Sequence, residues 1–258
     1  MPMTLSVKSP RIVLSALVAL LVLFVGCGPS KALQKKQATA GRELAEAYME
    51  EGKNRQALRE LEKAQIQNPG DHLLQNDLGL VYLALGEPAK AVEPFQKAVK
   101  LNPSFSAAIN NLGTAYLALR EWDKAKPLFE SLAHDLVYAT PYLPLHNLGF
   151  VAYNQGDYEL ALKRYQEALD LKPDFAQSWR GMGKTYMAMG RYAEATERLQ
   201  KAIELAPNFA EAYMDLAEAF LALGRKTEAL DALDQVIQML PDTPLAREAQ
   251  KKRVELGE

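Results

Sequence analysis

Prolines and small residues recur along this chain with a period of 34 residues, and this repeat constrains the fold more than any other feature. Prolines at one position of the repeat stand 34, 70, 34 and 34 residues apart, and 70 equals two periods plus two inserted residues. They are Pro69, Pro103, Pro173, Pro207 and Pro241. Aligned on this period, the chain contains six units that begin at residues 38, 72, 106, 142, 176 and 210.

Two positions of each unit carry only small side chains. The eighth residue is glycine or alanine in every unit: Ala45, Gly79, Gly113, Gly149, Gly183 and Ala217. The twentieth residue is always alanine: Ala57, Ala91, Ala125, Ala161, Ala195 and Ala229. Because small side chains let two helix axes come close, we expect each unit to be an antiparallel pair of helices.

Other repeated residues predict where these helices end and what lies between them. An aromatic residue recurs at position eleven in five units, while the fourth unit has Ala152 there with Tyr153 beside it. Glycines predict the end of the first helix in five units, at Gly52, Gly86, Gly156, Gly190 and Gly224. The repeated prolines end the second helix. Because one pair cannot bury its apolar face alone, the pairs are expected to stack into a single solenoid.

This pattern resembles the tetratricopeptide repeat, and the resemblance covers residues 38–243. It implies an all-α fold, a right-handed solenoid of six helix pairs, with residues 244–258 as a polar capping helix. A generic helical bundle is the alternative. The units expected are 38–71, 72–105, 106–141, 142–175, 176–209 and 210–243.

Composition excludes several classes of function. With 30 basic and 32 acidic residues, the chain lacks the broad positive field that nucleic-acid binding needs. One cysteine excludes an internal disulfide framework and a multi-cysteine zinc site, and the chain has only three histidines. We therefore expect no metal, no cofactor and no nucleic-acid partner.

The repeat leaves no room for a catalytic domain. Only residues 27–37 and 244–258 of the expected mature chain lie outside the units. Gly183-Lys184-Thr185 is similar to the end of a phosphate-binding loop, but that motif needs a glycine where Ser178 stands and a strand before it. We expect no catalytic residues and no small-molecule substrate.

The first residues are typical of a secretory signal. Lys8 and Arg11 precede an apolar run over residues 12–25, which is too short to span a bilayer comfortably. The only cysteine, Cys27, follows this run, and the arrangement resembles the bacterial lipoprotein signal. It implies removal of residues 1–26, acylation of Cys27 (palmitate among the acyl chains) and, with Gly28 next, a lipid anchor on the periplasmic face of the outer membrane. Residues 28–37 are expected to form a tether. A plain signal peptide and an uncleaved anchor are the alternatives.

The first helices should line the concave side of the solenoid, where positions 2, 5, 6, 9 and 12 share one face. Amides at these positions can donate and accept hydrogen bonds, which suits the backbone of an extended peptide. The triplets at Asn111 and Asn147 resemble the asparagine ladder of peptide-binding tetratricopeptide grooves. The alternative is that polar residues only keep this surface hydrated. The predicted partner-binding residues are Asn76, Asn110, Asn111, His146, Asn147, Phe150, Tyr153, Arg180 and Lys184.

The repeat is irregular only between the third and fourth units, where two residues are inserted. An exposed apolar patch is expected there, formed by Val137, Tyr138, Pro141 and Tyr142. Alternatively, Tyr138 fills the gap that the insertion leaves.

Together, the lipoprotein signal, the six repeats and the spacing of Asp135, Tyr138 and Pro141 resemble the type IV pilus secretin pilotin family (PilF, PilW and Tgl). This resemblance implies a protein that binds the secretin subunit and promotes its localisation and assembly into multimers in the outer membrane. The alternatives are a scaffold lipoprotein for another envelope complex and an accessory to a peptidase or cell-wall enzyme.

Overall fold

The computed structural model describes residues 30–133, 135 and 138–257, and within these residues the chain forms thirteen helices and no strand. The helices are α2 (Lys31–Glu50), α3 (Asn54–Gln67), α4 (His72–Ala84), α5 (Pro88–Leu101), α6 (Ser106–Ala118), α7 (Trp122–Ala133), α8 (Tyr142–Asn154), α9 (Tyr158–Leu171), α10 (Ala176–Ala188), α11 (Tyr192–Leu205), α12 (Ala210–Ala222), α13 (Lys226–Met239) and α14 (Pro244–Glu255). The prediction of an all-α chain built from six helix pairs and a final helix is confirmed.

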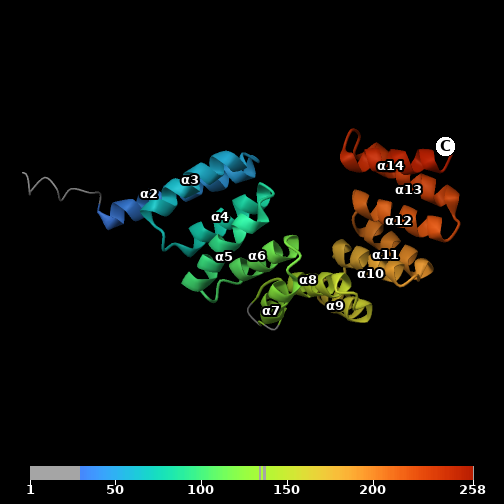
Figure 1. Ribbon diagram of the computed structural model, residues 1–258, viewed down its shortest axis with the longest axis horizontal. Helices are drawn as coiled ribbons and strands as arrows, with labels where there is room; N and C mark the ends of the chain where they lie inside the picture. The colour runs from blue at the N-terminus through green and yellow to red at the C-terminus, as the bar shows by residue number, and fades with distance from the viewer. Residues whose placement is uncertain (1–29, 134, 136–137, 258) are drawn as a thin grey trace, which may run out of the picture.

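The helix pairs stack in sequence order into a curved arc (Figure 1). Each first helix packs on the second helix of its own pair, and each second helix packs on the first helix of the next pair. Figure 1 shows α6 and α8 on the inner side of the arc, with α7 and α9 outside them. Such neighbour-to-neighbour packing is typical of a solenoid, and it leaves an inner surface formed by the first helices.

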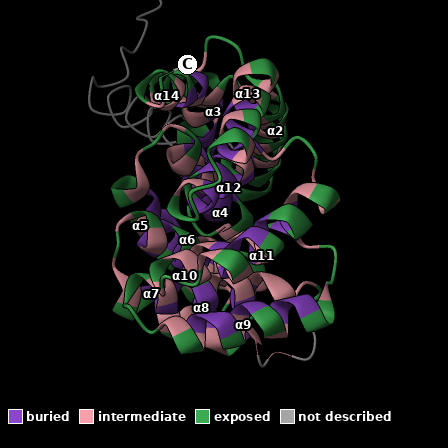
Figure 2. Cartoon of the chain, turned by 90° about the vertical axis from the view of Figure 1, so that its right-hand side faces the viewer, coloured by how far each residue is buried: buried purple, intermediate pink, exposed green. Residues whose placement is uncertain are grey.

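The small residues let the two helices of a pair approach. A methyl group on Gly79 would lie 2.4 Å from the ring of Phe95, and one on Gly113 would lie 2.6 Å from the ring of Phe129. The six alanines at position twenty are fully buried. In Figure 2, where each residue is coloured by burial, most helices carry both buried and exposed residues. The predicted close approach is confirmed.

A further repeated position forms the centre of each pair, and sequence analysis did not single it out. The twenty-fourth residue of every unit is large and almost completely buried: Leu61, Phe95, Phe129, Tyr165, Leu199 and Leu233. The signal was available, because a large apolar residue stands sixteen positions after each small residue of position eight.

Glycine conformation confirms the predicted turns. Gly52, Gly86, Gly156, Gly190 and Gly224 all have positive φ angles, between 71° and 82°. In the third pair Arg120 takes the same place with a φ of 58°, a conformation that costs free energy for any residue with a Cβ atom.

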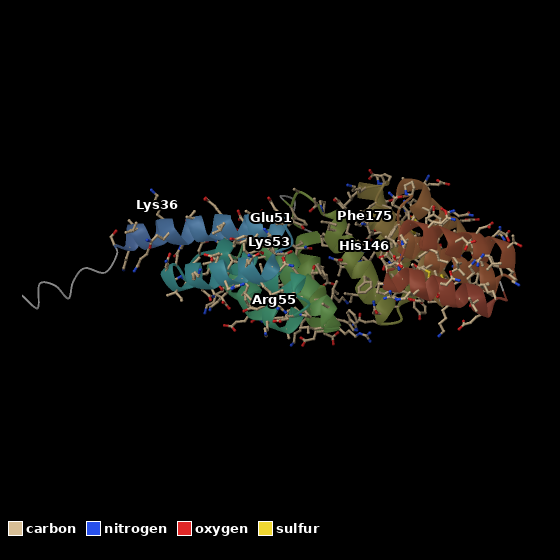
Figure 3. All side chains as sticks on the ribbon, turned by 90° about the horizontal axis from the view of Figure 1, so that it is seen from above. Lys36, Glu51, Lys53, Arg55, His146 and Phe175 are labelled. Atoms are coloured by element: carbon tan, nitrogen blue, oxygen red, sulfur yellow. The ribbon has the colours of Figure 1, made fainter. Side chains whose placement is uncertain are left out.

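The expected tether overlaps the first turns of a helix. Residues 31–37 belong to α2, which begins at Lys31 because the Ser30 side chain accepts a hydrogen bond from the Leu33 N–H and so caps the helix. Lys36 projects from this first part of α2 (Figure 3). The signal peptide and Cys27 lie outside the described residues. Among the residues that are described, none belongs to a helix with the length and apolarity needed to cross a bilayer.

Candidate functional site

Polar side chains connect neighbouring first helices on the inner surface. In three places, the fifth residue of one unit bonds to the sixth residue of the next, which forms a discontinuous ladder along the arc. Arg42 Nη1 donates to Asp77 Oδ2 (3.3 Å), Asn111 Nδ2 donates to Asn76 Oδ1 (2.9 Å), and Arg180 Nε donates to Asp215 Oδ2 (2.5 Å). These bonds tie α2 to α4, α4 to α6 and α10 to α12.

The ladder is interrupted in the middle of the molecule. The first helices on either side of the insertion, α6 and α8, pack less closely than the other successive first helices. Among the described residues, the buried Oδ1 atom of Asn110 has no hydrogen-bond partner. The next pair of first helices, α8 and α10, also lacks the bond, because position six of α10 is Gly181, which has no side chain to bond with His146 of α8. His146 Nδ1 instead shares a hydrogen bond with Ser178 Oγ at 3.0 Å.

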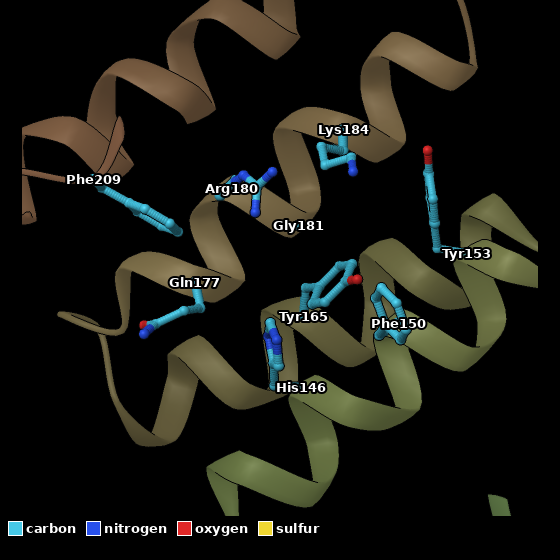
Figure 4. A pocket seen from close by; sticks show the side chains of 9 residues that line it. All are labelled: His146, Phe150, Tyr153, Tyr165, Gln177, Arg180, Gly181, Lys184 and Phe209. Atoms are coloured by element: carbon cyan, nitrogen blue, oxygen red, sulfur yellow. The ribbon is translucent and has the colours of Figure 1, made fainter. Parts of the chain in front are cut away.

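An aromatic cavity of about 170 Å³ opens at this second interruption. Figure 4 shows its residues: the ring of Tyr165 forms the floor near Gly181, with Phe150 and Tyr153 on one side and Phe209 on the other. Its lining is His146, Phe150, Tyr153, Tyr165, Gln177, Arg180, Gly181, Lys184 and Phe209. We call it the aromatic cavity below.

Two glycines explain why a tyrosine from an outer helix reaches the inner surface. Tyr165 belongs to α9, yet a methyl group on Gly149 or on Gly181 would lie 2.7 Å or 2.6 Å from its ring. The ring therefore occupies space that side chains on α8 and α10 would otherwise fill. An aromatic floor replaces the polar ladder at this point.

His146 is neutral in this environment. Its ring centroid lies 5.3 Å from those of Tyr165 and Phe175, and burial lowers its pKa to about 4. Burial also raises the pKa of Tyr165, so its phenol keeps its proton. Both polar rings thus present uncharged surfaces at neutral pH.

The charges at the rim of the cavity do not balance. Burial raises the pKa of Asp215, and the charges of Arg180 and Lys184 oppose this effect. Lys184 contributes a second positive charge, and its Nζ lies 5.8 Å from the Tyr153 ring. Among the described residues Lys184 forms no ion pair, whereas Glu218 pairs with Lys252 of α14. The rim therefore carries one more positive than negative charge.

The structure divides the predicted partner-binding residues into two groups. His146, Phe150, Tyr153, Arg180 and Lys184 surround the aromatic cavity. The amides lie elsewhere: Asn76 is bonded to Asn111, while Asn110 and Asn147 lie on the facing helices α6 and α8. Their role in binding stays a prediction.

Sequence analysis missed four lining residues of the cavity: Tyr165, Gln177, Gly181 and Phe209. Gly181 gave a usable signal, since glycine replaces a charged or amide residue at position six. Tyr165 and Phe209 lie outside the first helices, so no argument from a single helix face could place them there.

The junction before α8 differs from the expected exposed patch. Tyr138, Pro141 and Tyr142 are each half-buried, and Val137 lies outside the described residues. The ring centroids of Tyr142 and Phe175 lie 5.0 Å apart, and Lys172 Nζ lies 4.9 Å from the Tyr142 centroid. Packing against the following helix pair is the reason that Tyr142 does not form an exposed patch.

No group of three or more metal-binding side chains occurs within the described part of the chain. The inner surface offers aromatic rings, amides and the cations Arg42, Arg180 and Lys184, which are groups suited to holding a polypeptide segment.

Comparison with known proteins gives the same picture of the fold. Models described as tetratricopeptide repeat match residues 42–104, 180–244 and 95–126, and one described as TPR repeat matches residues 149–190. No curated protein sequence matched.

Several solved structures share the architecture. PilW, described as a widely conserved type IV pilus biogenesis factor, is 23% identical with a TM-score of 0.74, covering 83% of this chain and 98% of PilW. PilF of Pseudomonas aeruginosa is 18% identical with a TM-score of 0.67, covering 85% of this chain and 99% of PilF. A tetratricopeptide repeat protein of Parabacteroides merdae is 18% identical with a TM-score of 0.73, covering 84% of each chain.

Proposed function

This chain belongs to the tetratricopeptide repeat family, and from that premise we propose that it is a non-catalytic lipoprotein of type IV pilus biogenesis. In this proposal it binds the pilus secretin subunit and promotes its assembly into multimers in the outer membrane. The observation that carries the proposal is the likeness in fold to PilW and PilF along almost their whole length. The signal-like N-terminus with its single cysteine supports the lipid anchor.

The proposed mechanism needs a location and a docking surface. Acyl chains on Cys27 hold the protein at the periplasmic face of the outer membrane. The exposed first turns of α2 separate that anchor from the packed helix pairs. The inner surface then binds an extended segment of the secretin, and binding brings the subunits to the membrane in which they assemble.

Deleting the gene tests this proposal. We expect loss of the heat- and detergent-resistant secretin multimers and of surface pili, both restored by the wild-type gene. A Cys27→Ala protein should leave the membrane fraction and restore fewer multimers. Normal multimers and pili in the deletion strain, with a general envelope defect, would favour a scaffold for another envelope complex instead.

The amides of the inner surface can be tested separately. Replacing Asn111 and Asn147 together by alanine should weaken binding of the secretin's periplasmic region while helix content stays the same. Asn111 also bonds to Asn76, so each single variant shows which amide matters. Unchanged affinity of the double variant would count against a binding role for these amides.

A further inference from the structure

We infer that the aromatic cavity receives an aromatic side chain of the bound segment, and that Lys184 binds a carboxylate beside it. The inference rests on the proposed function only in that the protein docks a polypeptide segment. It goes further by stating the chemistry of that segment: an aromatic residue next to an aspartate or a glutamate.

The floor and walls of the cavity favour an aromatic occupant. The rings of Tyr165, Phe150 and Phe209 and the neutral imidazole of His146 surround the space. Phe150 is 37% exposed, and it is the only aromatic side chain among the exposed large apolar residues of the described chain. Aromatic rings attract one another in edge-to-face and offset arrangements, which adds to the free energy of burying apolar area.

The size of the cavity indicates one side chain rather than a cofactor. Its volume is about 170 Å³. Pockets that enclose small-molecule ligands usually measure about 300 to 1,000 Å³. An inserted side chain still leaves its own backbone on the inner surface, within reach of the polar groups there.

The charges at the rim determine what stands beside the aromatic residue. Arg180 is already bonded to Asp215, whereas Lys184 forms no ion pair among the described residues. Glu218 is bonded to Lys252 and does not neutralise Lys184. A carboxylate of the bound segment would pair with Lys184 and balance the excess positive charge.

Selection from a phage-displayed library of random linear peptides, with the full-length protein in detergent as bait, tests the inference. We expect enriched peptides to carry an aromatic residue within two positions of an acid. The consensus is then synthesised with a fluorescent label, together with one peptide whose aromatic residue is alanine and one whose acid is lysine. Affinity is measured by fluorescence anisotropy.

Two pairs of variants identify the residues responsible. Lys184→Glu should weaken the consensus peptide about tenfold or more, and the peptide with lysine in place of the acid should regain affinity for this variant. Phe150→Ala should weaken binding by a similar factor. The matched controls are Lys163→Glu and Leu171→Ala, which change exposed residues of the outer helix α9 and should alter affinity less than twofold.

Three results would overturn the inference: no enrichment on the wild-type protein, enriched peptides without the aromatic and acidic pair, or equal effects of Lys184→Glu and Lys163→Glu. The selection contains no secretin, so it is independent of the deletion experiment. Peptide binding as described with normal secretin multimers in the deletion strain would remove the proposed function and leave the inference in place.

Discussion

The inner surface differs between its two halves, although the same repeat builds both. In α2, α4 and α6 the side chains at positions five and six bond to one another, as Arg42 does to Asp77. Between α8 and α10 that connection is missing, because Gly181 has no side chain and Tyr165 occupies the space. It returns between α10 and α12, where Arg180 bonds to Asp215. The repeat thus determines the path of the backbone, while single positions determine whether the surface between helices is closed or open.

The largest expected effect is on stability: removing a ring from the core of the first half should cost far more unfolding free energy than removing a ring from the surface of the second half. Phe95→Ala should lower the free energy of unfolding by about 3 to 5 kcal/mol, because Phe95 is fully buried and its loss leaves a cavity. Phe150→Ala, at the rim of the aromatic cavity, should cost less than about 1 kcal/mol. Denaturant unfolding of both variants measures the contrast, and equal losses would contradict it.

Acid should weaken the second half through His146. The pKa of His146 is 6.5 in the unfolded chain and about 4 in the folded protein, so the unfolded chain binds a proton first as the pH falls. The free energy of unfolding therefore keeps its full value above pH 6.5 and decreases as the pH falls toward 4. The loss should reach at most about 3 kcal/mol.

The measurement is the free energy of unfolding of wild type and His146→Gln across that pH range. The difference between the two proteins should shrink as the pH falls, because only wild type can bind the extra proton on unfolding. A difference that does not change with pH would show that burial of His146 does not shift its pKa.

Two glycines of the first half should respond in opposite directions. Gly79→Ala should lower the free energy of unfolding by about 1 to 3 kcal/mol, since its methyl group would overlap the Phe95 ring. Gly41→Ala should raise it by about 0.5 to 1 kcal/mol, because the nearest atom lies 3.5 Å away and alanine favours a helix. Thermal unfolding distinguishes the two. A stabilising Gly79→Ala would show that the helices can separate without cost.

The smallest effect concerns the turn that precedes the irregular junction. Arg120→Gly should raise the free energy of unfolding by about 0.5 to 1 kcal/mol, because glycine adopts the positive φ angle of this residue without strain. Gly86→Ala, at the matching turn of the preceding pair, should lower it. Unfolding midpoints in urea measure both, and a destabilising Arg120→Gly would contradict the argument from backbone conformation.

Most of the fold could be predicted from the sequence because it depends on local repeats. The alanines of position twenty and the glycines of the turns act within one helix pair, so their spacing alone predicted the pairs. The start of α2 was missed because Ser30, the residue that caps it, lies outside the repeat.

The site could be predicted only in part. Residues on one face of a first helix, such as Phe150 and Lys184, follow from helical spacing. The aromatic floor depends on Tyr165 passing between Gly149 and Gly181, three residues on three different helices. A pattern along one helix cannot show such an arrangement, and Tyr142 packs on Phe175 for a similarly non-local reason.

Hydrogen–deuterium exchange of the full-length protein, with and without the purified periplasmic region of the secretin, tests whether the partner binds at the aromatic cavity. We expect bound secretin to slow exchange in α8, α10 and α12, around the aromatic cavity, and to leave exchange in α2 and the outer helices α3 and α5 unchanged. Slower exchange confined to α2 and α4, or no change in any helix, would contradict this expectation.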